Sequence, residues 1–327
     1  MPRSSRPRIE RIWAGRGPLA WALLPVGLVF LALVALRRFL YRVRLLSAVR
    51  LPVPVIVVGN ITAGGAGKTP LVLWLVDQLS RRGRRPGVVS RGYGGDAKGI
   101  GEVRDDSDAA EVGDEPLLMR RRAGCPVFVG ADRVGAARAL LAAHACDLIV
   151  CDDGLQHYRL ARDVEIAVVD RRGLMNGWPL PAGPLREPAA RLESVAAVVG
   201  NGWRAPFGMR LAGDRWHRLE DPSITRSAAD FAGLRLHAVA GIGDPQRFFD
   251  HLGALGLEFS AHALPDHHRY VAGDLAFDGD AILTTEKDAV KCAGLASLPV
   301  WVLPVTAMVE PDLAQFVLEK IDGCPPA

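Results

Sequence analysis

The chain lacks the sequence patterns of several common classes of protein. Its five cysteines show neither a CxxC pair nor the spacing of a zinc site, so we interpret them as small core residues of a reduced compartment. The 327 residues contain no internal repeat, no low-complexity tract and no Gly-x-Ser-x-Gly sequence typical of a serine hydrolase. The cysteines are Cys125, Cys146, Cys151, Cys292 and Cys324.

Excess positive charge is confined to the start of the chain. Residues 1–50 contain ten arginines and one glutamate, a net charge of +9. The whole chain carries +4, and the difference between +4 and +9 leaves a net −5 on the remainder. Because this remainder is mildly acidic, the sequence gives no support for a nucleic-acid partner.

Residues 17–36 form an uncharged run of 20 positions, followed by Arg37 and Arg38. The run is long enough to cross a bilayer as a helix, and its length and flanking residues do not fit a cleaved signal peptide. We therefore expect a retained membrane-associated helix, whose arginines are attracted to anionic head groups. A buried core helix is the alternative, and Pro25 and Gly27 would also allow a segment that lies in one leaflet.

Short apolar runs alternate with helical stretches along the rest of the chain. This alternation is typical of an α/β protein with a parallel sheet and crossover helices. A loop rich in proline and glycine at residues 176–184 separates two such series. The expected strands cover residues 53–58, 86–90, 126–129, 148–151, 164–170, 234–240, 281–284 and 300–303, and the expected helices cover residues 71–82, 114–122, 133–144 and 245–255.

Residues 62–69, with the sequence Thr-Ala-Gly-Gly-Ala-Gly-Lys-Thr, predict a phosphate loop between a strand and a helix. The glycines allow backbone N–H groups to surround a polyphosphate, Lys68 can reach the β and γ phosphates, and the Thr69 hydroxyl can bind Mg²⁺. The usual pattern has glycine where this chain has Thr62, and a glycine-rich turn is the alternative. The predicted nucleotide-binding residues are Thr62, Ala63, Gly64, Gly65, Ala66, Gly67, Lys68 and Thr69.

Two carboxylates, Asp152 and Asp153, follow the strand expected at residues 148–151. Acidic side chains at the carboxyl end of a sheet strand can hold Mg²⁺ directly or through water. Two carboxylates in one cleft repel each other unless a cation lies beside them. An acidic turn without a ligand is the alternative, and Gln156 is a candidate for polar contacts nearby.

Seven short motifs, in their order along the chain, resemble those of the tetraacyldisaccharide 4′-kinase family, the lipid A 4′-kinases. Each motif is weak alone, but together they cover essentially the whole chain. They are residues 59–60 with 64–69, 90–94 (Ser-Arg-Gly-Tyr-Gly), 113–116 (Gly-Asp-Glu-Pro), 152–157 (Asp-Asp-Gly-Leu-Gln-His), 181–188 (Pro-Ala-Gly-Pro-Leu-Arg-Glu-Pro), 241–243 (Gly-Ile-Gly) and 285–290 (Thr-Glu-Lys-Asp-Ala-Val).

This resemblance implies ATP-dependent phosphorylation of the 4′-hydroxyl of a tetraacylated glucosamine disaccharide 1-phosphate. The implied place is the cytoplasmic face of a Gram-negative inner membrane, and the implied cofactors are ATP and Mg²⁺. A substrate with four acyl chains cannot readily leave a bilayer, so the enzyme has to reach it there. The acylated lipid and the membrane are therefore the expected partners.

The implied fold is a P-loop NTPase-like parallel sheet with flanking helices, a smaller C-terminal α/β lobe and an N-terminal membrane-associated helix. We expect the membrane-anchoring segment over residues 1–50 and the P-loop kinase core over residues 51–230. The C-terminal lobe is expected over residues 231–327, where it would complete the active-site cleft.

For the proton transfer that accompanies phosphorylation, the resemblance points to Asp114 as the base, working with His267. A hydrogen bond from a histidine would orient the carboxylate and tune its proton affinity. Lys68 completes the expected catalytic residues because it neutralises phosphate oxygens. The adjacent His268 leaves the choice of histidine open, and the local pattern alone would indicate a surface aspartate and two solvated histidines.

Three arginines, Arg91, Arg133 and Arg186, are candidates for binding the phosphates of ATP or of the sugar. Their planar guanidinium groups can make two charge-assisted hydrogen bonds, although each could equally be a surface ion-pair partner. Glu187 is a candidate for holding Mg²⁺ or the ribose. Tyr93 is a candidate for packing in the cleft.

Two other interpretations retain the phosphate loop. A membrane-associated P-loop NTPase switch that binds a protein partner would want a guanine-reading Asn-Lys-x-Asp sequence, and residues 285–288 have the wrong spacing. The sequence also gives no role to Lys287 and Asp288. A kinase of a soluble metabolite would use the apolar run only as a tether.

Overall fold

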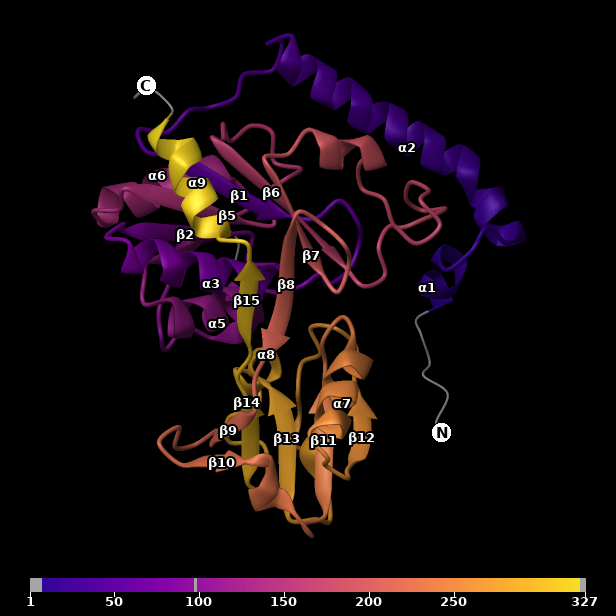
Figure 1. Cartoon of the computed structure of the whole chain (residues 1–327), viewed down its shortest axis with the longest axis vertical. Helices are drawn as coiled ribbons and strands as arrows, with labels where there is room; N and C mark the ends of the chain where they lie inside the picture. Colours follow the sequence, from indigo (N-terminus) through magenta and orange to yellow (C-terminus); the bar gives the residue numbers. More distant parts are fainter. Residues whose placement is uncertain (1–7, 97–98, 324–327) are drawn as a thin grey trace.

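The computed structural model describes residues 8–96 and 99–323, which form a large lobe and a smaller lobe (Figure 1). The sheet of the large lobe is parallel except at its two edge strands, β3 and β15, which are antiparallel to their neighbours. Its strands in spatial order are β15 (Thr306–Glu310), β8 (Phe207–Ala212), β7 (Ala197–Asn201), β6 (Val164–Asp170), β1 (Val55–Gly59), β5 (Leu148–Asp152), β2 (Pro86–Ser90), β4 (Val127–Val129) and β3 (Gly101–Val103).

Helices cover both faces of this sheet, which explains why its central strands are continuous apolar runs. Every residue of β1, β2 and β5 is buried, as expected for a parallel sheet between two helical layers. One face packs against α3 (Lys68–Arg81), α5 (Asp114–Ala123) and α9 (Leu313–Asp322), and the other packs against α6 (Arg133–Ala143). The predicted α/β fold is confirmed.

The smaller lobe has its own sheet and its own core. Its strands in spatial order are β10 (Thr225–Ser227), β9 (Arg215–Arg218), β14 (Val300–Leu303), β13 (Ala281–Thr285), β11 (Leu236–Ala240) and β12 (Ser260–Ala263). Trp216, Phe231 and Trp301 pack together with side chains of α7 (Pro245–Ala254). The remaining short helices are α4 (Ala109–Val112), α8 (Glu286–Ala289) and the 3-10 turns Ala189–Glu193, Ala228–Phe231 and Ala272–Leu275.

The boundaries between the lobes differ from those expected, because the chain crosses between the two sheets twice. β9 and β10 lie in the expected core segment, residues 51–230, but β9 pairs with β14 of the smaller sheet. β15 and α9 lie in the expected C-terminal lobe, residues 231–327, but β15 pairs with β8 of the large sheet. The smaller lobe therefore extends from β9 to β14, which differs from the expected boundary between residues 230 and 231.

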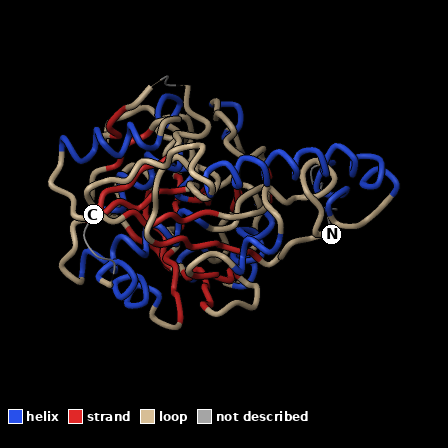
Figure 2. Tube along the Cα trace, turned by 90° about the horizontal axis from the view of Figure 1, so that it is seen from above, coloured by secondary structure: helices blue, strands red, loops and turns tan. Residues whose placement is uncertain are grey.

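Two helices precede the large lobe: α1 (Arg8–Trp13) is short, and α2 (Pro18–Arg42) extends along one side of the molecule (Figures 1 and 2). The most apolar stretch of α2 has a mean hydropathy of 2.6 and is only 11% buried, which contradicts the alternative of a core helix. By length and composition, α2 could cross a membrane. Pro25 lies within the continuous helix, and Gly27 allows close packing because a Cβ there would lie 3.1 Å from the carbonyl oxygen of Pro179.

The described cysteines are free thiols and three of them are core residues. Cys125, Cys151 and Cys292 are buried, and Cys146 is half-buried. Burial raises the pKa of the Cys125 thiol to about 12, which keeps it protonated and unreactive. Cys324 lies outside the described residues.

We expect Leu75→Ala to lower the free energy of unfolding by about 2–5 kcal/mol, because the cavity that it leaves lies inside a packed core. Leu75 has no exposed surface and lies in α3, directly behind the phosphate loop. Ile224→Ala removes a side chain that is 44% exposed, and it should change stability by less than about 0.5 kcal/mol. Urea denaturation of both variants tests this difference, and equal losses would contradict the assigned packing.

Candidate active site

The loop between β1 and α3 has the backbone geometry of a phosphate loop. Gly64 and Gly67 have φ angles of +96° and +91°, which residues with a side chain rarely adopt. A Cβ on Gly67 would lie 2.4 Å from Nδ2 of Asn201, whose amide also donates to the carbonyl of Ala66 at 3.1 Å. Lys68 is the first residue of α3, so the loop leads into a helix N-terminus as predicted.

Three charged groups predicted from the sequence meet beside this loop. Lys68 Nζ lies 3.5 Å from a carboxylate oxygen of Asp153 and 3.2 Å from Oδ1 of Asn60. Arg186 Nη1 lies 3.3 Å from the other oxygen of Asp153. Burial would raise the pKa of Asp153, but Lys68 and Arg186 outweigh that effect and lower it. The Asp153 carboxylate is therefore ionised and holds two cations next to the phosphate loop.

Asp152 is an almost fully buried carboxylate, and one of its two oxygens accepts no hydrogen bond from the described residues. Ser90 Oγ donates to Oδ2 at 3.1 Å, whereas Oδ1 has no hydrogen-bond partner among the described residues. Burial, with the negative charges of Glu115 and Asp153, raises the pKa of Asp152 to about 7. A buried oxygen without a partner is unfavourable, and a bound cation would remove both the repulsion and the unsatisfied oxygen.

Asp114 and His267 meet across the two lobes. Asp114 begins α5 of the large lobe and is 3% exposed, and His267 comes from the loop after β12 in the smaller lobe. His267 Nδ1 lies 2.9 Å from Asp114 Oδ1, and Lys291 Nζ lies 3.1 Å from Oδ2. The Tyr93 ring packs edge-on against the His267 ring at 4.9 Å. The structure thus brings together Asp114 and His267, the pair to which the resemblance pointed, and places Tyr93 and Lys291 beside them.

The neighbouring histidine has a different partner. His268 Nε2 lies 2.8 Å from a carboxylate oxygen of Asp274, within the smaller lobe. His267 adopts a φ of +59°, a left-handed conformation that turns the loop at this residue. The geometry therefore favours His267 over His268 as the partner of Asp114.

The Asp114 carboxylate is held in its ionised form. Burial alone would raise its pKa, but the hydrogen bond with His267 and the charges of Lys287 and Lys291 lower it to about 2. Asp114 is therefore a carboxylate over the whole physiological range of pH, and it can accept a proton.

The motif at residues 285–290, to which the sequence gave no role, joins the lobes. Lys287 Nζ lies 2.9 Å from Oε1 of Glu115 in the large lobe and 3.0 Å from Oδ1 of Asp266. Asp288 is buried, accepts from the backbone N–H of Gly241 at 3.0 Å and lies 3.2 Å from Lys291 Nζ. This short segment therefore supports both the Asp114 cluster and the glycine-rich turn after β11.

Two predicted residues, Glu187 and Gln156, form a network that adjoins the phosphate loop, because Gln156 Nε2 also donates to the carbonyl of Asn60 at 3.1 Å. Gln156 Nε2 donates to Glu187 Oε1 at 2.7 Å, Tyr158 donates to the other carboxylate oxygen, and Arg191 Nε lies 3.2 Å from it. The described part of the chain contains no group of three His, Cys, Asp or Glu side chains placed to hold a metal. Glu187 is held within this network, and its role in holding Mg²⁺ or the ribose stays a prediction.

The other two predicted arginines, Arg91 and Arg133, make no contact with the cluster of Lys68, Asp153 and Arg186 within the described residues. Arg133 is buried, and its guanidinium donates to the carbonyls of Gly130 and Ala131 in its own turn. Its guanidinium is therefore used within the turn before α6, whose N-cap is Asp132. Arg91 is exposed after β2 and makes no hydrogen bond or ion pair within residues 8–96 and 99–323.

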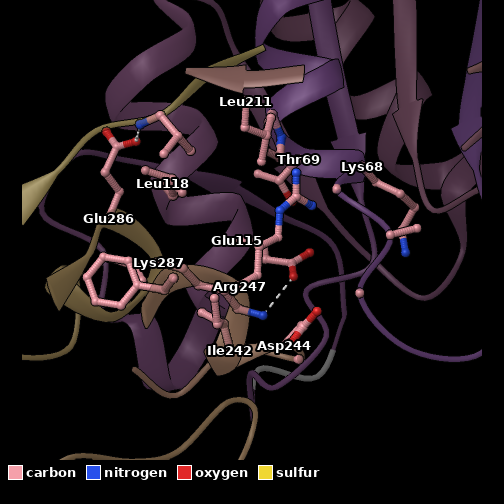
Figure 3. Close-up of a pocket in the computed structure, with 18 of the residues that line it drawn as sticks. Lys68, Thr69, Glu115, Leu118, Leu211, Ile242, Asp244, Arg247, Glu286 and Lys287 are labelled. Atoms are coloured by element: carbon pink, nitrogen blue, oxygen red, sulfur yellow. Dashed lines mark hydrogen bonds and ion pairs between the residues drawn. The ribbon is translucent and has the colours of Figure 1, made fainter. Parts of the chain in front are cut away.

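A cavity of about 470 Å³ lies between the lobes at the phosphate loop (Figure 3). Lys68 and Thr69 lie on its large-lobe side, and Ile242, Arg247 and Lys287 come from the smaller lobe. A second cavity of about 250 Å³ is lined by Asp114, His267, Tyr270 and Lys291, among others. Because Glu115 lines the first cavity and Asp114 the second, the N-terminus of α5 forms part of the wall between them.

Sequence reasoning missed four residues of the site: Glu115, Lys291, Asn201 and Arg247. Arg247 Nη2 donates to Asn201 Oδ1 at 2.6 Å, which links α7 to the back of the phosphate loop. Glu115 belongs to the motif at residues 113–116, so the sequence could have indicated it. Asn201, Arg247 and Lys291 lie in no motif, and only the fold brings them to the site.

The chain is similar to known proteins along nearly its whole length. Residues 19–322 match the family model described as tetraacyldisaccharide-1-P 4′-kinase. The chain belongs to this family. It is 54% identical to the tetraacyldisaccharide 4′-kinase of Azoarcus sp., with 99% of each chain covered. It is 52% identical to that of Aromatoleum aromaticum, with 94% of this chain and 96% of the relative covered.

A solved structure agrees with this assignment to the tetraacyldisaccharide 4′-kinase family. The crystal structure of LpxK from Aquifex aeolicus in complex with ATP matches with a TM-score of 0.80 and 28% identity. The match covers 93% of this chain and 99% of that chain, so the family fold includes both lobes. The family resemblance read from the seven motifs is therefore confirmed.

Asp152→Asn should stabilise the metal-free protein increasingly as the pH rises. The folded-state pKa of Asp152 is raised, so its stabilising contribution is complete below the unfolded pKa of about 4 and is lost as the pH rises through about 7. The melting temperature of the variant relative to wild type should therefore increase between those two pH values and then level off, as calorimetry without Mg²⁺ can measure.

Asp153→Asn is the matched variant for this test. Because the pKa of Asp153 is lowered by Lys68 and Arg186, its carboxylate stabilises the fold above the unfolded pKa, and the variant should melt at a lower temperature at neutral pH. Equal pH profiles for the two variants would contradict the assigned environments.

Proposed function

We propose that this chain phosphorylates the 4′-hydroxyl of a tetraacylated glucosamine disaccharide 1-phosphate with ATP, a step of lipid A biosynthesis. The observation that carries this proposal is the buried Asp114 carboxylate, which His267 and Lys291 hold in a cavity that adjoins the cavity at the phosphate loop. The family membership and the curated names of the relatives support the same activity. No observation on the structure favours a partner-binding switch.

The phosphate loop supplies the binding of the polyphosphate. Its backbone N–H groups and the N-terminus of α3 attract negative charge, and Lys68 neutralises phosphate oxygens as charge develops on them. Arg247 lies across the cavity from Lys68, on the smaller lobe, and adds a second cation. Closing the polyphosphate between the two lobes would orient its terminal phosphate and exclude water from it.

Asp114 would receive the proton of the acceptor hydroxyl. The hydroxyl oxygen bonds to the γ phosphorus, the bond from that phosphorus to the β–γ bridging oxygen breaks, and ADP leaves. A carboxylate with a pKa of about 2 is a weak base, but it suffices because the hydroxyl becomes strongly acidic as its bond to phosphorus forms late in a loose transition state. His267 and Lys291 would keep the Asp114 carboxylate ionised and oriented toward the acceptor hydroxyl.

Mg²⁺ fits the acidic side chains beside the phosphate loop. Thr69, Asp152 and Asp153 would hold it, and the unpartnered Oδ1 of Asp152 is the observation that supports a cation there. When bound, the ion would neutralise phosphate oxygens.

The exposed apolar surface of α2 supports a site of action at a membrane. Leu28, Val29 and Leu33 are each more than half exposed, and arginines follow at Arg37 and Arg38. A lipid with four acyl chains stays in its bilayer, so a kinase with such a helix can meet it there. We place the enzyme at the cytoplasmic face of the inner membrane because ATP is supplied in the cytosol.

Asp114→Ala should lower kcat by about 10²–10⁴-fold while the Kd for ATP changes little, because the carboxylate acts on the acceptor proton. Lys68→Ala should instead weaken ATP binding. Transfer of label from γ-labelled ATP to a detergent-dispersed tetraacyl disaccharide 1-phosphate measures kcat. Calorimetric titration with ATP measures the Kd for ATP.

A remote acid and histidine pair provides the control for these variants. Glu102 and His144 lie 2.8 Å apart at the edge of the large lobe. Glu102→Gln should leave both kcat and the Kd for ATP unchanged. Loss of ATP binding in Asp114→Ala would remove this residue from the role of base. Hydrolysis of ATP without labelled lipid in wild type would favour the partner-binding switch.

Substituting Val29 and Leu33 together by aspartate should release the enzyme from phospholipid vesicles, because each charge in a bilayer costs about 2.5–3.5 kcal/mol. Both side chains are more than 60% exposed on α2, so the change should leave the fold intact. Vesicle flotation measures the release, and activity on vesicle-embedded lipid should fall more than activity in detergent. Unchanged flotation would refute the role given to α2.

A further inference from the structure

Arg172 lies between the N-terminal helices and the phosphate loop. We propose that Glu10 of α1 and Arg172 act as a pair of positioning residues for ATP, through which docking of the N-terminal segment sets the geometry of the phosphate loop. This inference rests on the proposed ATP site, and it goes beyond it by giving the N-terminal segment a part in nucleotide binding.

Arg172 touches the loop directly. Its Nη2 donates to the carbonyl of Gly65 at 3.1 Å, and Gly65 lines the cavity at the phosphate loop. A Cβ on Gly64 would lie 3.2 Å from the same Nη2, so the guanidinium also limits how far the loop can shift toward it. The orientation of the Gly65 carbonyl fixes the peptide plane that it shares with the N–H of Ala66, and such N–H groups bind the phosphates.

Arg172 is itself held from two sides. Asp170, the last residue of β6, accepts from Arg172 Nε at 2.9 Å and from Nη2 at 2.7 Å. Glu10 Oε1 lies 3.1 Å from Nη1, and both partners of this ion pair are about one-fifth exposed. Asp170 binds the Nε and Nη2 side of the guanidinium, and Glu10 binds Nη1. The position of α1 therefore contributes to the orientation of Nη2.

The short helix α1 is docked firmly enough to transmit its position. Trp13 is 7% exposed, and its Nε1 donates to the carbonyl of Pro181 at 3.0 Å. Asn176 ties the following turn, because its backbone N–H donates to the carbonyl of Trp13 and its side chain to that of Gly15. The chain then enters α2 at Pro18, so the docked α1 connects the apolar helix to the phosphate loop (Figure 1).

A purely structural ion pair would behave differently from a positioning pair. A structural pair stabilises the fold, and its loss lowers the melting temperature while the remaining folded enzyme binds ATP normally. A positioning pair changes the affinity for ATP in the folded enzyme and leaves the chemical step intact. The two roles are therefore separated by KM for ATP and kcat, measured on full-length enzyme well below its melting temperature.

The test compares Glu10→Gln, Arg172→Lys and the double variant with wild type. We expect Glu10→Gln to raise KM and Kd for ATP about two- to fivefold, the size of one partly exposed ion pair, with kcat nearly unchanged. The double variant should be no worse than Arg172→Lys alone, since both substitutions interrupt the same chain of contacts. Glu220→Gln, which removes an ion pair with Arg218 in the smaller lobe, should alter none of these quantities.

Unchanged Kd for ATP in Glu10→Gln would overturn the proposal, as would effects of the two substitutions that simply add. A lower melting temperature with normal KM would also overturn it, because the pair would then be structural. Failure of wild type to bind ATP would refute the proposed function instead, so the two failures are distinguishable in the same titrations.

Discussion

The contact between Asp114 and His267 is the interaction on which the arrangement of this molecule depends. A carboxylate that is 3% exposed at the start of α5 has to be compensated by groups from outside its own lobe, and His267 and Lys291 provide that compensation. The smaller lobe therefore forms part of the proposed active site. Lys287, which pairs with Glu115, joins the lobes beside the same carboxylate.

The site contains two pairs of adjacent acidic residues, and the two side chains of each pair have different surroundings. Asp114 and Glu115 are adjacent, yet one faces the cavity shared with His267 and the other the cavity at the phosphate loop. Asp152 and Asp153 are divided in the same way, since Asp153 binds Lys68 and Arg186 whereas Asp152 is buried with a raised pKa. Asp153 is compensated by protein cations, and Asp152 lies where a ligand can compensate it. Asp114 and Glu115 are both paired with lysines of the smaller lobe, Lys291 and Lys287.

Local sequence patterns predicted the phosphate loop, because glycines at positive φ and a helix N-terminus are consequences of nearby residues. They also predicted α2 from its composition. The partner of Asp114 followed only from the family resemblance, since 153 positions separate it from His267. The exchange of β9 and β15 between the sheets was missed because strand pairing at long range leaves no local pattern. Contacts of Asn201 and Arg172 with the phosphate loop were hidden for the same reason.

A double-mutant cycle on lipid phosphorylation tests the central claim, that Asp114 and His267 act as one unit across the lobes. Rates of label transfer from γ-labelled ATP to the tetraacyl disaccharide 1-phosphate would be compared for Asp114→Ala, His267→Ala and the variant with both changes. The account predicts that the double variant is about as slow as the slower single variant, because each change disables the same unit. Losses that multiply would show two independent groups and contradict the account.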